Sequence, residues 1–253
     1  MANVVRRYKG RVAIVVGGAS GIGEGFAHRF AREGASVGVL DLDPTKGHAV
    51  VEALKAHGVD ATYAEVDVTD ADSTAAGVDA VVAALGRLNV AVNSAGIGGG
   101  MHLLTEFPVA DWKQTIMVNL VGMFHCLRAE IPHMEASGGS IVNIASMVGA
   151  VAHRMTTAYV ASKHGVVGLT RSAALEWGNR QIRVNAVGPT WVRTPLTDPV
   201  VPEAAWAEMG ADHPIGRVAT IEDIAGLVAF LGSDDAAIIT GAFYLADGGY
   251  TAR

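Results

Sequence analysis

Short apolar runs alternate with longer helical segments along the whole chain, and this alternation restricts the fold more than any other feature. Seven runs are expected to be strands: 12–16, 36–40, 62–65, 90–93, 140–144, 183–187 and 242–245. Six segments between them are expected to be helices: 22–33, 45–57, 70–85, 111–134, 159–177 and 221–231. Several strands are apolar throughout, which is typical when helices cover both faces of a sheet. The order predicts an α/β fold with a seven-stranded, doubly wound parallel sheet.

The composition excludes several classes of protein. At 253 residues the chain suits one domain, expected to span 1–253, and its net charge of −6 argues against nucleic acid as a partner. The first apolar run is too short for a signal peptide, and no uncharged run reaches the ~20 residues of a membrane span. The single cysteine, Cys126, fits a reducing compartment, so a cytoplasmic protein is expected. The basic cluster Arg6, Arg7, Lys9 and Arg11 is expected to be a solvated arm.

A glycine-rich turn joins the first strand to the first helix. Gly17, Gly21 and Gly23 are spaced Gly-x-x-x-Gly-x-Gly, with Ser20 and Ile22 between them. Such a turn lets the backbone approach a pyrophosphate, and the helix N-terminus then supplies N–H groups and a favourable dipole. The chain has no Walker Gly-Lys-Ser/Thr ending, which disfavours a nucleoside triphosphate.

Asp41 ends the second strand, about 20 residues past the glycines, and Leu42 follows it. A carboxylate there can accept hydrogen bonds from the adenosine ribose and would repel a 2′-phosphate. No Lys or Arg adjoins Asp41, and Ser20 is neutral. The sequence therefore favours NAD over NADP.

Tyr159 and Lys163 form a Tyr-x-x-x-Lys pair on a predicted helix, which places them one turn apart on the same face. A nearby ammonium favours the charged form of a phenol, so the pKa of Tyr159 is expected to fall below ~10. Such a phenol is suited to general acid/base chemistry on an alcohol or ketone.

Taken together, these residues resemble the short-chain dehydrogenase/reductase family, in the roughly 250-residue oxidoreductase type with a Rossmann fold. The resemblance covers essentially the whole chain and rests on markers in family order: Gly17 to Gly23, Asp67-Val68, Asn93-Ser94-Ala95-Gly96, Asn119, Ser146, Tyr159-x-x-x-Lys163, Asn185 to Thr194 and Asp247-Gly248-Gly249.

The resemblance implies four catalytic residues. Tyr159 would exchange a proton with the substrate oxygen, while Lys163 would lower the tyrosine pKa and bind the nicotinamide ribose. Ser146 would hydrogen-bond the same substrate oxygen. Asn119 would hold a water near the lysine.

The resemblance also implies cofactor contacts. Asp67 and Val68 would flank the adenine, while Asn93, Ala95 and Gly96 would pack on the adenosine side. Pro189, Val192 and Thr194 would position the nicotinamide. Four positions depart from the family pattern: Val16, Ser94, Thr190 and Gly188. Thr190 stands where glycine is usual, and Gly188 is expected to restore backbone freedom.

The segment from Thr194 to His213 departs from the strand–helix rhythm, and we expect an irregular substrate loop at about 194–214. Apolar residues are expected near the substrate, and this lining suits a neutral, apolar or alicyclic alcohol or ketone. The candidate substrate residues are Ser146, Val148, His153, Thr190, Trp191 and Trp206. The histidines lack metal-ligand spacing, so no catalytic metal is predicted.

Three alternatives compete with an NAD-linked alcohol or ketone oxidoreductase. An NADPH-dependent 3-oxoacyl thioester reductase is disfavoured by Asp41, and a non-catalytic nucleotide-binding protein by the intact Ser146, Tyr159 and Lys163. A sugar-nucleotide epimerase would normally need a longer chain. The family implies a homotetramer built on the segments 111–134 and 159–177.

Overall fold

The computed structural model describes residues 6–252, and within that range seven strands form one fully parallel sheet. The order is β3-β2-β1-β4-β5-β6-β7. Successive strands are therefore added on one side of β1 up to β3 and on its other side from β4 onward. Each strand lies within two residues of its predicted bounds: β1 Val12–Val16, β2 Ser36–Asp41, β3 Ala61–Glu65, β4 Val90–Asn93, β5 Gly139–Ile144, β6 Ile182–Pro189 and β7 Phe243–Ala246.

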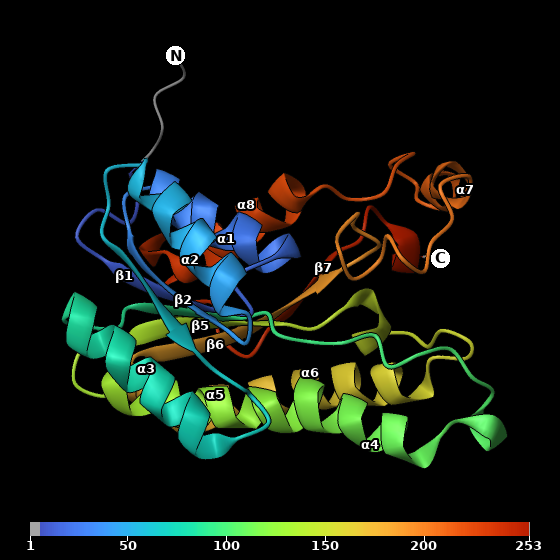
Figure 1. The fold of residues 1–253 in the computed structure, drawn as a ribbon, viewed down its shortest axis with the longest axis horizontal. Helices are drawn as coiled ribbons and strands as arrows, with labels where there is room; N and C mark the ends of the chain where they lie inside the picture. The colour runs from blue at the N-terminus through green and yellow to red at the C-terminus, as the bar shows by residue number, and fades with distance from the viewer. Residues whose placement is uncertain (1–5, 253) are drawn as a thin grey trace.

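Helices cover both faces of the sheet, as predicted (Figure 1). One face carries α1 (Gly21–Arg32), α2 (Pro44–Lys55) and α8 (Ile221–Gly232), and the other carries α3 (Ala71–Leu85), α5 (Gly122–Glu130) and α6 (Thr157–Trp177). Strand β1 is buried throughout because its alternate residues enter opposite cores. Val15 packs in the first core, and Ile14 packs in the second. The remaining helical turns are short: Leu104–Glu106, Met147–Gly149, Gly178–Arg180, Asp234–Ala236 and Tyr250–Ala252.

The helical segment expected over 111–134 is present and runs over 109–133, but it is not one regular α-helix. It begins earlier as α4 (Val109–Ile116), passes through a π-helical turn at Met117–Val121, continues as α5 and ends in a 3-10 turn at Ile131–His133. A π turn inserts one extra residue into a helix and often occurs at functional sites. Asn119 lies within this turn.

The segment expected to be irregular contains a short helix, α7 (Ala205–Ala211). Trp206 of α7 is buried under the Arg193 guanidinium, which lies 4.8 Å from the ring centroid. Arg193 also forms a bidentate pair with Glu203, at 2.7 and 2.9 Å. These tertiary contacts stabilise a helix too short to persist alone.

The predicted basic arm also differs from expectation. Arg7 forms two hydrogen bonds with the buried carboxylate of Glu33, at 2.7 and 2.8 Å, and Arg11 pairs with Asp234 at 2.5 Å. Between them Tyr8 is buried against Phe30. The arm is therefore fastened to the domain. Across residues 6–252 the structure contains no helix with the length and apolar character of a membrane span.

Candidate active site

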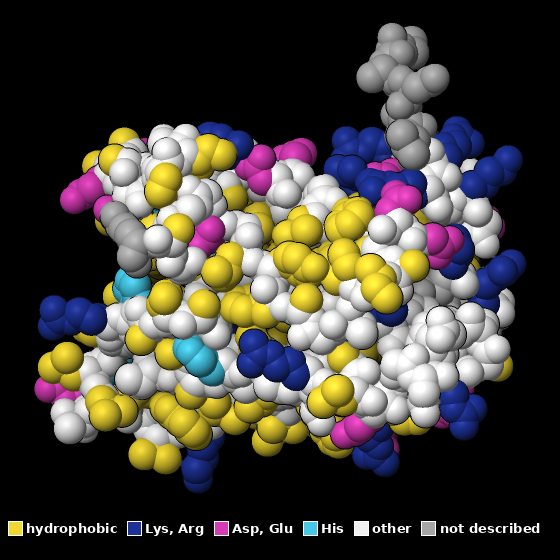
Figure 2. Space-filling view, turned by 180° about the vertical axis from the view of Figure 1, so that it is seen from behind, with side chains coloured by type: hydrophobic (Ala, Val, Ile, Leu, Met, Phe, Trp, Pro, Cys, Tyr) yellow, Lys and Arg dark blue, Asp and Glu magenta, His cyan; other side chains and the backbone are white. Residues whose placement is uncertain are grey.

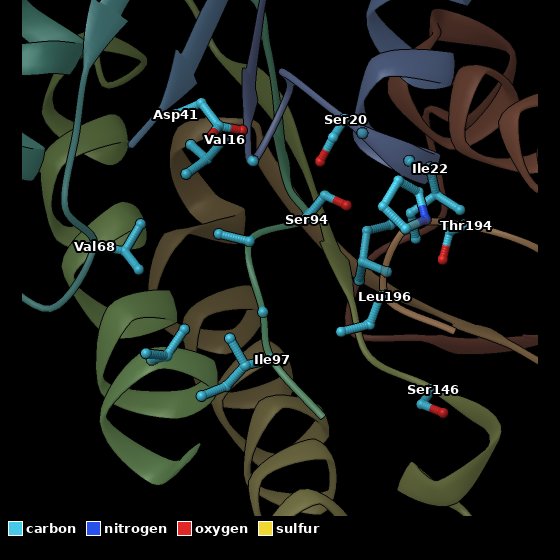
Figure 3. A pocket seen from close by; sticks show the side chains of 18 of the residues that line it. Val16, Ser20, Ile22, Asp41, Val68, Ser94, Ile97, Ser146, Thr194 and Leu196 are labelled. Carbon is cyan, nitrogen blue, oxygen red and sulfur yellow. The ribbon is translucent and has the colours of Figure 1, made fainter. Parts of the chain in front are cut away.

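A cavity of about 500 Å³ opens at the carboxyl ends of β1, β2, β4, β5 and β6. This is the edge at which doubly wound sheets bind their ligands. Figure 3 shows Asp41 and Ser146 at opposite ends of the cavity, with Ser20 and Ile22 between them and Thr194 and Leu196 along one wall. The cavity is large enough for a dinucleotide to lie partly enclosed along it.

The glycine-rich turn, residues 17–23 and called the phosphate turn below for its expected role, leaves no room for a side chain at two of its glycines. Gly17 has φ of +74°, and a Cβ there would lie 2.6 Å from the Ala95 amide nitrogen. A Cβ on Gly23 would collide with the Gly17 carbonyl oxygen. Ser20 is the N-cap of α1 but its side chain makes no capping bond, so the first-turn N–H groups are not capped by it. This turn fits a pyrophosphate.

Two backbone N–H groups hold the carboxylate of Asp41 beside the glycine-rich turn. Its Oδ2 accepts a 2.9 Å hydrogen bond from the Ala19 N–H, and its Oδ1 accepts one of 3.2 Å from the Asp43 N–H. These bonds fix the carboxylate beside the turn. Lys163 is the one Lys or Arg that the described residues contribute to the lining, and it lies at the opposite end.

Tyr159 and Lys163 lie on α6 at the Ser146 end of the cavity. The buried Lys163 donates a 2.9 Å hydrogen bond from Nζ to the Ile144 carbonyl, and its ammonium lies 5.5 Å from the centroid of the Tyr159 ring. Burial lowers the pKa of Lys163 to about 8. The ammonium and ring are thus neighbours, as the helical spacing predicted.

The expected fall in the tyrosine pKa does not occur in the protein alone. Burial raises the pKa of Tyr159, and a hydrogen bond with Ser146 opposes that rise. The expectation counted the ammonium of Lys163 and omitted the cost of burying a phenolate. A further positive charge at this end of the cavity would favour the phenolate.

Asn119 supports the wall next to Lys163 and does not itself line the cavity described by residues 6–252. Its side-chain amide accepts a hydrogen bond from the Ile97 N–H at 2.8 Å and donates one to the Ile97 carbonyl at 2.9 Å. A Cβ on Gly96 would lie 3.6 Å from Lys163 Nζ, so this segment passes close to the ammonium. The water predicted beside Asn119 stays a prediction.

Asn93 was predicted to contact the cofactor, but the structure places its side chain in the core behind the cavity. Its Nδ2 donates to Glu130 Oε2 at 3.1 Å and to Asn143 Oδ1 at 3.0 Å. Successive strand residues point to opposite faces, and Asn93 points inward. Glu130 is fully buried, and burial raises its pKa to about 8.

All the other predicted cofactor residues line the cavity: Gly17, Ser20, Gly21, Ile22, Gly23, Asp41, Leu42, Asp67, Val68, Ala95, Gly96, Tyr159, Lys163, Pro189, Val192 and Thr194. Of the candidate substrate residues, Ser146 and Thr190 line it. Within the described chain Val148, His153, Trp191 and Trp206 do not. Trp206 is covered by Arg193, and the His153 ring faces Trp191 at 6.0 Å.

Gln114 and Val118 are among the lining residues that sequence reasoning missed. They are four residues apart in a helical segment and so share one face, and this spacing was the available signal. The expectation that Gly188 restores backbone freedom was wrong, because the φ of Gly188 is not positive. A Cβ there would lie 2.7 Å from the Phe243 ring and 3.0 Å from the Ser146 carbonyl oxygen. Glycine is required at position 188 because the Phe243 ring and the Ser146 backbone leave no room for a side chain.

The architecture and the cavity define a Rossmann-type α/β protein, and comparison with known proteins gives its family. A family model described as "Enoyl-(Acyl carrier protein) reductase" matches residues 17–251. Cyclohexanol dehydrogenase of Acinetobacter sp. (strain SE19) is 39% identical over 248 residues, covering 98% of this chain and 97% of that protein.

Two further proteins extend the comparison. A 3-oxoacyl-[acyl-carrier-protein] reductase of Staphylococcus aureus (strain N315) is 41% identical over 239 residues, covering 94% and 96% of the two chains. Carveol dehydrogenase from Mycobacterium avium, solved in complex with NAD, has a TM-score of 0.92 and 32% identity, covering 98% of this chain and 99% of that chain. The chain belongs to the short-chain dehydrogenase/reductase family.

Proposed function

We propose that this protein transfers a hydride between NAD(H) and a neutral secondary alcohol or its ketone. The observation that carries this proposal is one cavity with Asp41 at one end and Ser146, Tyr159 and Lys163 at the other. The phosphate-binding turn lies between them. A nicotinamide dinucleotide bound along the cavity would bring its reactive ring to the tyrosine.

Side chains of the protein carry out the proton transfer of this reaction. In alcohol oxidation Tyr159 Oη takes the hydroxyl proton while the carbinol carbon loses a hydride, and Ser146 hydrogen-bonds the oxygen that becomes a carbonyl. Lys163 would contact the nicotinamide ribose, and Gly17 to Gly23 would hold the pyrophosphate. The bound oxidised nicotinamide supplies the hydride acceptor and a positive charge. That charge would favour the phenolate, which burial alone disfavours.

NAD is proposed over NADP because Asp41 stands at the adenosine end with its carboxylate fixed by two backbone N–H groups. Asp41→Ala is expected to relax the preference for NAD at least tenfold, because a charge-assisted hydrogen bond to the ribose is lost and the repulsion of a 2′-phosphate is removed. Titration of NADH and NADPH by fluorescence measures both affinities.

A matched control for Asp41→Ala is Asp43→Asn, because Asp43 caps α2 by accepting from the Lys46 N–H at 3.1 Å and lies outside the cavity lining of the described residues. It should leave the NADH-to-NADPH ratio unchanged. An unchanged ratio in Asp41→Ala would mean that another group selects the cofactor.

The substrate end favours a neutral, apolar molecule. Ile97, Val192 and Leu196 line it, and across the described residues no arginine enters the lining to pair with a carboxylate or phosphate. Arg193 is engaged with Glu203 and Trp206. An alicyclic secondary alcohol fits this lining, and the similarity to cyclohexanol dehydrogenase supports that class.

A panel of substrates tests the proposal. Wild-type protein with NAD⁺ should form NADH from cyclohexanol and other alicyclic secondary alcohols, and should oxidise NADH with the matching ketones. A 3-oxoacyl thioester with NADPH is the competing arm, since the Staphylococcus aureus relative bears that name. Faster turnover in that arm than with every alcohol would overturn the proposed substrate class.

We also propose a cytoplasmic homotetramer. Large apolar side chains are exposed on α5, α6 and the C-terminal part of the chain, among them Phe124, Leu175 and Ile238. Apolar side chains also gather across the middle of the face seen in Figure 2. Burying such surface between subunits would stabilise an assembly with closed symmetry. Light scattering during size-exclusion chromatography should report four copies, and a monomer would contradict the proposal.

A further inference from the structure

A buried hydrogen bond joins the end of the substrate loop, residues 194–214, to the wall of the cavity. Thr190 Oγ1 and His213 Nε2 lie 2.6 Å apart, and both side chains are buried. We propose that His213 is a positioning residue that holds the loop, through Thr190, in the form that binds substrate. This inference rests on the proposed function, because it concerns the substrate end of the same cavity.

The direction of the hydrogen bonds follows from the partners of His213. Its Nδ1 lies 2.7 Å from the Met209 carbonyl oxygen, which can only accept, so Nδ1 carries the proton. In the neutral ring Nε2 is then the acceptor, and Thr190 donates its hydroxyl proton. The ring also packs against Tyr250, with centroids 5.1 Å apart. The imidazole is therefore fixed from three sides.

Thr190 is placed to transmit this bond to the reacting end of the cavity. It lines the cavity next to Pro189, and its N–H donates to the Ala246 carbonyl at 3.3 Å. Its hydroxyl also lies 3.4 Å from the sulfur of Met147, the residue that follows Ser146. The Thr190 side chain thus contacts both Met147 and His213, which lies near the C-terminal end of the loop.

The loop has a second fastening at its start. Thr197 Oγ1 donates to the Val192 carbonyl at 2.6 Å and accepts from the Thr194 N–H at 3.0 Å. Pro195 and Leu196, which lie inside this fastening between Thr194 and Thr197, form part of the cavity wall. Release of the His213 end would free residues 198–213 and the Thr190 side chain in the cavity wall, while residues 194–197 and the Asp41 end would stay in place.

This arrangement gives a reason for the departure at Thr190, where the family usually has glycine. A glycine has no hydroxyl to offer His213. The pair predicts that loss of the hydroxyl weakens substrate binding and leaves cofactor affinity unaltered, because the phosphate turn joins β1 to α1 and Asp41 ends β2, outside the loop.

Three variants test the pair: Thr190→Val, Thr190→Ser and His213→Phe. Thr190→Val keeps the shape and removes the donor, so KM for the alcohol should rise roughly two- to tenfold, the effect of one hydrogen bond. His213→Phe should raise KM similarly, and the double variant should be no worse than the worse single variant. Thr190→Ser keeps the hydroxyl and should recover most of the loss. The affinity for NADH should stay within twofold in all of them.

Hydrogen exchange of the loop provides a readout that does not depend on turnover. Amides in 204–213 should exchange faster in Thr190→Val than in wild type, and Thr190→Ser should resemble wild type. His133→Phe is a matched control, because His133 bonds Asp79 at 2.7 Å on α3, away from the loop. The inference is overturned if Thr190→Val changes neither loop exchange nor KM, or if Thr190→Ser loses as much as Thr190→Val. Faster loop exchange in Thr190→Val, in a protein that oxidises no alcohol, would overturn the proposed function and the substrate-binding role, leaving only a structural bond.

Discussion

Tyr159→Phe is expected to lower the turnover number at least ~10²-fold with any alcohol that the wild type oxidises. The ring and its contact with the Lys163 ammonium are kept, so the cavity should retain its shape. The hydroxyl that exchanges the proton is lost. Steady-state formation of NADH gives the turnover number, and fluorescence titration gives the affinity for NADH.

The affinity for NADH should be nearly the same in Tyr159→Phe and in wild type, because the phosphate turn and Asp41 are untouched. This separates loss of chemistry from loss of folding. Full turnover in Tyr159→Phe would contradict the role assigned to the tyrosine. Ser146→Ala offers a second comparison, because Ser146 lines the same end of the cavity as Tyr159.

Glu130→Gln is expected to stabilise the protein above neutral pH. The carboxyl is buried, its pKa is raised to about 8, and its Oε1 has no hydrogen-bond partner. In the unfolded chain the pKa is about 4.3, so the unfolded state loses its proton first as pH rises. The contribution of Glu130 is therefore greatest below pH ~4.3 and declines by up to about 1.4 kcal/mol per pH unit until the pH reaches the folded pKa.

Glutamine cannot ionise and keeps an acceptor for the Asn93 amide, so it removes this decline. Urea unfolding should show a gain in the free energy of unfolding at pH 8 that shrinks markedly at pH 5. An equal change at both pH values would contradict a neutral Glu130.

Glu33 is the matched contrast. Burial would raise its pKa, but hydrogen bonds from Arg7 and Arg29 outweigh burial and lower it. Glu33→Gln should therefore destabilise the protein at neutral pH, and the loss should shrink as pH falls through the lowered pKa.

The central strands could be predicted closely because they are short, largely apolar runs that helices cover on both faces, whereas the edge strands β3 and β7 are only half buried. The positions of the glycine turn and Asp41 could also be predicted, since both belong to one strand–helix–strand unit with a characteristic spacing. The π turn at Asn119 was not, because the apolar pattern of 111–134 continues through it unchanged. An inserted residue alters backbone hydrogen bonds without altering composition.

The substrate wall was harder to predict than the cofactor wall because it depends on how the loop packs. Trp206 was expected near the substrate, yet it is buried under the Arg193 guanidinium, which Glu203 holds in place. His213 carried no sequence signal, and its partners Met209 and Thr190 become visible only in the folded chain. Likewise, the raised pKa of Tyr159 depends on burial, which helical spacing does not report.

The central claim is that this cavity transfers a hydride directly from a carbinol carbon to NAD⁺. The measurement that tests it most directly uses cyclohexanol carrying deuterium at the carbinol carbon, with mass spectrometry of the reduced cofactor. Direct transfer predicts that the NADH formed carries the deuterium, and that Tyr159→Phe forms it at least ~10² times more slowly. Unlabelled NADH, or no NADH from any secondary alcohol while NADH still binds, would contradict the claim.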